Sequence, residues 1–334
     1  MNGIYSQVLV IGIDAGGTRS RAYLAEATPE GAVLGRGGGG PGNALSVGRA
    51  DLTRHLAEAI REAIAEALPA APDLRERVAA AFGGFAGAAV GVGPERGYDL
   101  AVSCLRDALA ANGITGAAVG VGGDTDIALA SAPGAPADGL VLIAGTGAIA
   151  ARLTGRRRAV VIDGHGWLLG DEGSGFWLGN RGVRAALEAL DERGPWTSLV
   201  RRVTAHYLGE EAAGSVAGPA PAEVRHRVAE AIVSRAYEQA PPRLAALSRT
   251  VVEEAGNGDA VAEALLDEAA GLLAATVRAL GPLPGEPLVA TGGLLGPDGP
   301  LLARVTARLA PLGLRVFPVP DGSPGAAALA CELL

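Results

Sequence analysis

The sequence predicts an α/β protein built from two domains. Its 334 residues exceed the usual length of one domain, which is roughly 100 to 200 residues. Short apolar segments alternate with segments of helical periodicity, as in a sheet flanked by helices. A strand, a turn rich in glycine and threonine, and a second strand occur once in each half of the chain, which indicates an internal repeat. We expect a ligand cleft between the two halves.

The first half alternates strands with helices. Apolar or β-branched runs mark short buried strands, and a four-residue spacing of leucine and isoleucine marks an amphipathic helix. The predicted strands are residues 8–13, a return strand beginning at Tyr23 to Ala25, 78–82 and 117–121. The predicted helices are one that follows the glycine run 37–40 and carries Leu52, Leu56, Ile60, Ile64 and Leu68, and one over residues 100–111.

The pattern restarts after residues 133–136. This Pro-Gly-Ala-Pro segment breaks both periodicities, so we place a domain boundary there, with domains over residues 1–132 and 133–322. The strands predicted in the second domain are 140–144, 148–153 and 288–290. Beyond residue 180 we expect a largely helical chain with a surface loop over residues 214–221.

The composition excludes several classes of function. The formal net charge of −8 disfavours nucleic acid and anionic membranes as partners, so a small ligand is the better expectation. Cys104 and Cys331 lie in apolar surroundings without a CxxC spacing, which indicates structural thiols in a reducing cytoplasm. Gly12 and Asp14 break the first apolar run, and no basic region precedes it. We therefore expect neither a signal peptide nor a membrane span.

Two loops carry the residue types that bind phosphate. Asp14-Ala15-Gly16-Gly17-Thr18 follows the first strand. Its glycines let main-chain amides approach an anion, Thr18 adds a hydroxyl, and Asp14 suits a hydrated magnesium ion. Gly145-Thr146-Gly147 offers the same chemistry in the second half. Each loop alone also fits an ordinary tight turn, but their pairing favours a polyphosphate held from both sides.

Asp124 follows the predicted strand 117–121 and two glycines. Phosphoryl transfer needs in-line positioning, charge neutralisation and a carboxylate that accepts the hydroxyl proton. Such a base contributes about 10²- to 10⁴-fold. Asp126 is the alternative base, and either residue can instead cap a helix that begins near Ile127. We interpret Asp124 as the base and Asp126 as the cap.

Residues 164–177 are the densest group of functional side chains. Two acids and two indoles stand among five glycines, which suits a loop that offers carboxylates to sugar hydroxyls and an aromatic face to a ring. The alternative is a domain-packing loop in which Asp171 caps the following helix.

Seven segments, in order and over nearly the whole chain, resemble the BadF/BadG/BcrA/BcrD-type ATPases of the actin, sugar-kinase and Hsp70 superfamily. Within that family they are most similar to the N-acetylglucosamine kinases. The segments are IGIDAGGTRSRAYL, FGGFAGA, VGGDTDIALAS, LIAGTGAIA, GWLLGDEGSGFWLG, VATGGLLGP and SPGAAALA. The resemblance implies two actin-like (ribonuclease H-like) domains, with a final helix over about 323–334 that packs back on the first. It also implies transfer of phosphate from ATP to the 6-hydroxyl of an amino sugar, in a homodimer.

The same resemblance implies roles for individual residues. Asp124 matches the catalytic base, and Asp14 matches the residue that holds Mg²⁺ through water. The residues expected near the nucleotide are Asp14, Gly16, Gly17, Thr18, Gly145, Thr146, Gly147, Gly292 and Gly293. The residues expected near the sugar are Asn43, Asp124, Gly147, His165 and Asp171.

His165 departs from the family pattern. Members active on N-acetylglucosamine usually carry an aromatic residue between the two glycines of Gly164-His165-Gly166, close to the substituent on the second carbon of the sugar. Free glucosamine or another amino sugar therefore stays open beside N-acetylglucosamine. A histidine that only hydrogen-bonds the loop is a further alternative.

Other members of the superfamily give the alternative functions. Activator ATPases of radical dehydratases hold an iron–sulfur cluster through cysteines, and Cys104 and Cys331 do not lie at the corresponding loop. The ROK sugar kinases carry a zinc-binding cysteine motif that this sequence lacks. A non-catalytic sugar or nucleotide sensor is the alternative from a different class, and it predicts binding without release of ADP.

Overall fold

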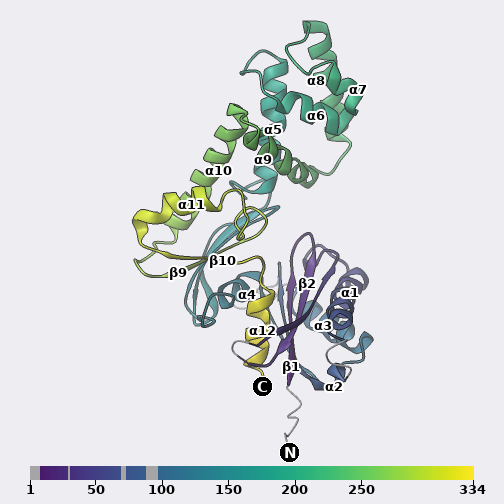
Figure 1. The fold of residues 1–334 in the computed structure, drawn as a ribbon, viewed down its shortest axis with the longest axis vertical. Helices are drawn as coiled ribbons and strands as arrows, with labels where there is room; N and C mark the ends of the chain where they lie inside the picture. The colour runs from purple at the N-terminus through teal and green to yellow at the C-terminus, as the bar shows by residue number, and fades with distance from the viewer. Residues whose placement is uncertain (1–7, 29–30, 69–72, 88–96) are drawn as a thin grey trace, which may run out of the picture.

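The computed structural model describes residues 8–28, 31–68, 73–87 and 97–334. Within these residues the chain forms two five-stranded mixed sheets, each with its own helices (Figure 1). Two short helices, α4 (Asp124–Ala130) and α12 (Ser323–Cys331), lie between the sheets (Figure 1). No helix in the described part of the chain is long and apolar enough to cross a membrane.

The first sheet has the strand order β3-β2-β1-β4-β5. Its strands are β1 (Leu9–Ala15), β2 (Ser20–Glu26), β3 (Val33–Gly39), β4 (Val78–Phe85) and β5 (Ala118–Gly123). Its helices are α1 (Arg49–Ala67), α2 (Leu74–Arg77) and α3 (Tyr98–Ala111). Alternate residues of β1 face opposite sides, so Leu9, Ile11 and Ile13 share one buried cluster with the apolar stripe of α1. Val10 faces the other side and packs against α12.

The second sheet has the order β10-β9-β6-β7-β8. Its strands are β6 (Gly139–Ala144), β7 (Ala148–Thr154), β8 (Arg157–Asp163), β9 (Pro287–Thr291) and β10 (Arg315–Pro318). If the strands of each sheet are numbered 1 to 5 in chain order, both sheets have the spatial order 3-2-1-4-5. In both, the first three strands are antiparallel, and the fourth and fifth run parallel to the first. The internal repeat in the sequence therefore corresponds to two copies of one topology.

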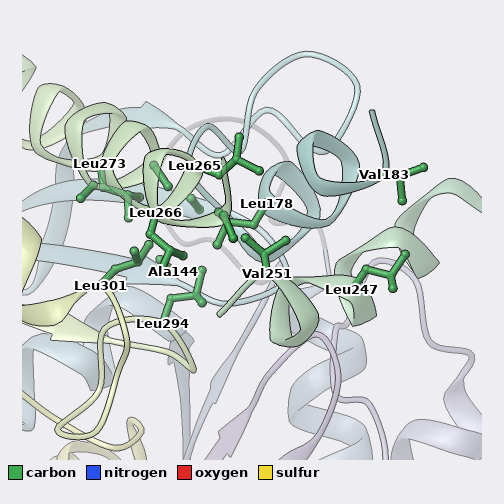
Figure 2. Close-up of a cluster of buried hydrophobic side chains, with 14 of the residues drawn as sticks. Ala144, Leu178, Val183, Leu247, Val251, Leu265, Leu266, Leu273, Leu294 and Leu301 are labelled. Carbon is green, nitrogen blue, oxygen red and sulfur yellow. The ribbon is translucent and has the colours of Figure 1, made fainter. Parts of the chain in front are cut away.

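Helices between β8 and β9 form the upper part of the molecule in Figure 1. They are α5 (Gly175–Leu190), α6 (Leu199–Leu208), α7 (Glu210–Gly214), α8 (Ala222–Tyr237), a 3-10 helix (Pro241–Leu247), α9 (Ser248–Gly256) and α10 (Ala260–Ala279). After β9 come α11 (Leu302–Leu309) and a second 3-10 helix (Ala310–Leu312). Figure 2 shows how leucines of α5 and α10 pack with residues of the second sheet and its loops into the largest buried cluster.

The helices between the two sheets hold the halves together. Ala128 and Leu129 of α4 (Asp124–Ala130) pack with Val141 and Val289 of the second sheet, although α4 follows directly from the first. α12 (Ser323–Cys331) packs on β1 and β4 of the first sheet, although it follows the second. A Cβ atom at Gly12 would lie 2.3 Å from the main-chain nitrogen of Ala327, so this contact requires glycine.

Three strands, β3, β8 and β10, were not predicted from the sequence. β3 contains part of the glycine run, and added Cβ atoms at Gly35, Gly37 and Gly39 would each lie within 2.1 Å of carbonyl oxygens of α1. These glycines therefore allow α1 to lie directly on the strand, whereas glycine ordinarily weakens a strand prediction.

The predicted surface loop over residues 214–221 is partly wrong. Residues 215–221 do join α7 to α8 without regular structure. However, Val216 and Ala220 are buried in the core of the helical region, so this connection contributes to packing.

Candidate functional site

The first candidate phosphate loop connects β1 to β2. The Gly16 N–H donates to the carbonyl of Arg19 at 3.0 Å and closes the turn. Gly17 and Thr18 are exposed, and a Cβ atom at Gly17 would meet nothing within 4 Å. The loop therefore presents open main chain and a free hydroxyl at the carboxyl end of β1, as an anion site requires.

Two further segments join this loop. The Ala86 N–H, just beyond β4, donates to Ala15 O at 3.0 Å, and the Gly42 N–H donates to Gly16 O at 2.8 Å. Asn43 therefore lies next to the first candidate phosphate loop. Its Oδ1 accepts the Leu45 N–H at 2.8 Å, which fixes the side chain. Residues 88–96, which follow this region, lie outside the described residues.

The Asp14 carboxylate lies at this edge of the sheet with a perturbed pKa. The Gly322 N–H donates to its Oδ2 at 2.9 Å, and Arg21 beside it forms an ion pair with Asp321 at 3.5 Å. Burial raises the pKa of Asp14 to about 6, and the charges of Asp321 and Asp124 act in the same direction. The Gly322 hydrogen bond and Arg21 oppose the rise. A bound cation would favour the ionised form of this carboxylate.

The predicted base, Asp124, is the first residue of α4, so the helix begins three residues earlier than Ile127. Its N-cap is Gly123, and neither aspartate occupies that position. Asp126 nevertheless caps the helix from its third position, because its Oδ2 accepts the Gly123 N–H at 2.8 Å. The Asp124 Oδ1 accepts the Thr125 N–H at 2.8 Å.

Asp124 is partly buried and keeps some solvent-accessible surface. Burial raises its pKa, Asp126 adds to the rise, and Arg158 of β8 lowers it. A carboxylate with a raised pKa accepts a proton more readily at neutral pH. Arg158 comes from the second sheet, so the electrostatic environment of Asp124 depends on both halves of the molecule.

The second candidate phosphate loop, residues 145–147, connects β6 to β7 and rests on the start of α5. The first amides of that helix donate to the loop, Gly175 N–H to Gly145 O at 2.7 Å and Phe176 N–H to Thr146 O at 3.0 Å. Ser174 is the N-cap of α5, since its Oγ accepts the Trp177 N–H at 3.2 Å. The alternative in which Asp171 caps this helix is therefore wrong.

Asp171 instead lies against the second phosphate loop. A Cβ atom at Gly147 would lie 2.7 Å from its Oδ2, and its carboxylate accepts the N–H groups of Ala148 and Gly166. Burial raises the pKa of Asp171, and the charge of Asp163 adds to the rise. His165 is exposed on the same turn.

Asp163 was missed by sequence reasoning. It is the last residue of β8, and its two carboxylate oxygens accept the N–H groups of Asp171 at 2.7 Å and Glu172 at 2.8 Å. The available signal was an aspartate directly before a glycine at the end of an apolar segment, a pattern typical of turns closed by side-chain hydrogen bonds.

Gly292 and Gly293 follow β9 and lie beside the second loop. Gly292 has a φ of +94°, and a Cβ atom there would lie 2.3 Å from Ala144 O, so this position requires glycine. A Cβ atom at Gly293 would meet nothing within 4 Å. Of the predicted glycines at the carboxyl ends of β6 and β9, Gly145 and Gly293 therefore border open space, whereas Gly147 and Gly292 are closed off by Asp171 and Ala144.

The loop-bearing edges of the two sheets face each other. β6, β9 and β10 are parallel, so their carboxyl ends share one edge with the second phosphate loop. Four residues beyond the end of β10, Gly322 donates to Asp14 at the carboxyl end of β1. Four residues span at most about 14 Å, so the edges that carry the two phosphate loops lie close together.

Metal ligands are sparse at this edge. The described residues contain no group of three or more His, Cys, Asp or Glu side chains placed to hold a metal ion. Mg²⁺ usually keeps several waters and needs only one or two carboxylates besides substrate phosphates, so Asp14 is sufficient for such a site. A cavity of about 440 Å³ lies elsewhere, between α5 and α10, and contains none of the predicted site residues.

Comparison with known proteins gives a family match over most of the chain. The model of the BadF/BadG/BcrA/BcrD ATPase family matches residues 11–303. An N-acetylmuramic acid/N-acetylglucosamine kinase of Clostridium acetobutylicum is 29% identical over 273 residues, which are 81% of this chain and 78% of that protein. An N-acetyl-D-glucosamine kinase of Dictyostelium discoideum is 33% identical over 182 residues, 51% of each protein, so the match spans about half the length of that relative.

A solved structure supports the same grouping. A Chromobacterium violaceum protein assigned to the N-acetylglucosamine kinases has a TM-score of 0.69 and 26% identity, and the match covers 97% of this chain and 99% of that one. The predicted family and the predicted two-domain α/β fold are confirmed. The predicted class of enzyme, an ATP-dependent carbohydrate kinase, agrees with these matches.

Proposed function

Because this chain belongs to the BadF/BadG/BcrA/BcrD ATPase family, we propose that it phosphorylates the 6-hydroxyl of an amino sugar, N-acetylglucosamine or glucosamine, with ATP. The observation that carries the proposal is the placement of Asp124. Its carboxylate interacts with Asp14 at the first phosphate loop and with Arg158 of the second sheet. This placement supports a base close to both loops, where we propose that the terminal phosphate of the nucleotide lies.

The nucleotide is proposed to lie between the two loops. The open main chain at Gly17 and Gly145 fits phosphate oxygens, and the open side of Gly293 fits the adenosine. Mg²⁺ would be held through water by Asp14, and when bound it would neutralise phosphate charge during transfer. The raised pKa of Asp14 fits this role, because a carboxylate that is costly to ionise alone gains most from a cation.

The sugar is proposed to lie between Asn43 and Asp171, with its 6-hydroxyl toward Asp124. Asn43 is fixed by its hydrogen bond to Leu45, and Asp171 by its hydrogen bonds to main-chain N–H groups, so both can orient a hydroxyl without first becoming ordered. An ionised carboxylate has about four lone-pair sites, so Asp171 can accept sugar hydroxyls beside its two amides. The exposed His165 would approach the substituent on the second carbon.

The proposed reaction needs one proton transfer by the protein. Asp124 accepts the proton of the 6-hydroxyl as that oxygen attacks the γ-phosphorus, and ADP leaves from the opposite side. Arg158 and the Thr125 N–H stabilise the ionised form that must be present beforehand. Closure of the two halves around the substrates would exclude water and protect ATP from hydrolysis.

The experiment that tests this proposal measures ADP release with a panel of sugars. N-acetylglucosamine, glucosamine, N-acetylmannosamine, N-acetylmuramate and glucose are each offered with ATP and Mg²⁺, and phosphorus-coupled NMR locates the phosphate on the product. The proposal expects an amino sugar to give the highest kcat/KM and a 6-phosphate product. Sugar binding without ADP release would instead support the sensor function. A homodimer and a cytoplasmic location remain predictions.

The cysteines offer little support for the activator alternative. Cys104 is buried within α3, where its Sγ lies 3.7 Å from Arg49 O. Cys331 ends α12, and burial raises the pKa of its thiol. A raised pKa disfavours the thiolate that would ligate a cluster.

A further inference from the structure

The turn between β8 and α5 is held by one side chain at its start. Each carboxylate oxygen of Asp163 accepts a different main-chain N–H, Oδ1 from Asp171 and Oδ2 from Glu172. The two distances, 2.7 and 2.8 Å, are in the range of charge-assisted hydrogen bonds. Asp163 therefore closes a loop of eight to nine residues back on its own strand.

The backbone of this turn is unusual at both ends. Asp163 has a φ of +63° and Asp171 a φ of +58°, a left-handed conformation that residues other than glycine adopt rarely. Such conformations persist where the surrounding contacts determine them, and they occur often at functional sites. A Cβ atom at Gly170 would lie 2.2 Å from Asp163 Oδ1, so glycine at this position allows the carboxylate to approach.

The turn conformation determines where the Asp171 side chain lies. The Asp171 main chain is fixed by Asp163, and its carboxylate then reaches Gly147 of the second candidate phosphate loop and the N–H of Ala148 at the start of β7. A continuous chain of hydrogen bonds thus runs from the end of β8 through Asp171 to the loop between β6 and β7.

We propose that Asp163 is a positioning residue that holds Asp171 in the geometry needed to bind the sugar. This inference rests on the proposed function, in which Asp171 accepts sugar hydroxyls. It predicts that Asp163 acts on sugar affinity through Asp171, without touching substrate itself. The alternative is that Asp163 only stabilises a surface turn, with no consequence for the sugar site.

Three variants separate these two roles. Asp163→Gly removes both acceptors but keeps a positive φ accessible, so it adds no backbone strain. Asp163→Asn retains one acceptor oxygen and tolerates the same φ. Asp138→Asn is the matched control. The Asp138 carboxylate also accepts a main-chain N–H in a loop of the second sheet, that of Gly155 at 2.7 Å, but this loop lies at the opposite end of β8.

The first measurement is amide hydrogen exchange, which needs no sugar. We expect the amides of Asp171 and Glu172 to exchange about 10- to 100-fold faster in Asp163→Gly than in the wild type, with a smaller increase in Asp163→Asn. Asp138→Asn should leave both amides unchanged. Wild-type exchange rates at these two amides in Asp163→Gly would overturn the inference, even if the protein proves to phosphorylate no sugar.

The second measurement is a double-mutant cycle on the KM for the sugar. Asp163→Gly should raise this KM by about 10-fold with a much smaller change in kcat, and Asp163→Asn should restore part of the loss. In a protein that already carries Asp171→Asn, Asp163→Gly should raise the KM for the sugar little further, because the two residues act in one chain of contacts. Effects that multiply fully would show that Asp163 acts independently of Asp171 and would overturn the proposal. Absence of sugar phosphorylation by the wild type would count against the proposed function alone.

Discussion

Replacing Asp14 with asparagine removes a negative charge whose burial lowers the free energy of unfolding. The carboxylate is partly buried at the end of β1, near Asp321 and Asp124, and its pKa rises from 3.8 to about 6. At 1.36 kcal/mol per pKa unit, this rise corresponds to about 3 kcal/mol at neutral pH. Asparagine keeps an oxygen that can accept the Gly322 N–H, so the variant should lose the charge and keep that contact.

The pH dependence of this effect has a definite sign. Below about pH 4 both the folded and the unfolded wild type are protonated at Asp14, and the charge has no effect on stability. Between about pH 4 and 6 the folded state holds the proton more tightly, so the contribution of Asp14 to the free energy of unfolding falls as pH rises. Above about pH 6 the full cost is present. Asp14→Asn should therefore be more stable than the wild type at pH 8, by up to about 3 kcal/mol.

The assay is denaturant unfolding at pH 8 and at pH 4, without nucleotide or Mg²⁺. We expect the variant to gain stability at pH 8, to match the wild type at pH 4, and to have no measurable kinase activity, because Asp14 is the proposed Mg²⁺ residue. Asp138→Asn, at an exposed turn, is the control for loss of a carboxylate. A variant less stable than the wild type at pH 8 would refute the reasoning.

Three further predictions concern other residues. Asp124→Asn should lower kcat by about 10²- to 10⁴-fold while sugar affinity, measured by calorimetry, stays within about 2-fold; unchanged turnover would exclude Asp124 as the base. Gly292→Ala should destabilise the protein by more than about 2 kcal/mol in denaturant unfolding, because the φ is +94° and the added Cβ would lie 2.3 Å from Ala144 O. Gly293→Ala is the control and should fold normally, because its Cβ would lie in open space. His165→Trp should raise the kcat/KM ratio of N-acetylglucosamine to glucosamine, and an unchanged ratio would separate this side chain from sugar choice.

Much of the fold was predictable where the signal is local. β1 and β6 are short apolar runs that end in glycine-containing turns, so these strands and the two turns between neighbouring strands followed directly from the sequence. β3 was missed because its glycines are explained by close packing against α1. Sequence periodicity does not reveal such a contact between separate segments. The starts of helices were also imprecise: α4 begins at Asp124 because Asp126 caps it from inside.

The candidate site was predictable to the extent that its residues follow strands. Asp14 and Asp124 both stand at the carboxyl ends of strands in the first sheet, where side chains from separate segments converge. Asp163 was missed because its role depends on a turn that folds back on β8. The Gly322 N–H that binds Asp14 lies 308 residues away along the chain, and no local pattern indicates such a contact.

The position of α12 has a consequence for synthesis on the ribosome. β1 emerges early, but the helix that covers its Val10 face is made about 300 residues later. At 5 to 20 residues per second, this delay is about 15 to 60 s. During that interval only α4, which packs beside α12 and contacts β4, can cover part of this side of the nascent first sheet. The side is therefore completed only after translation has passed residue 331.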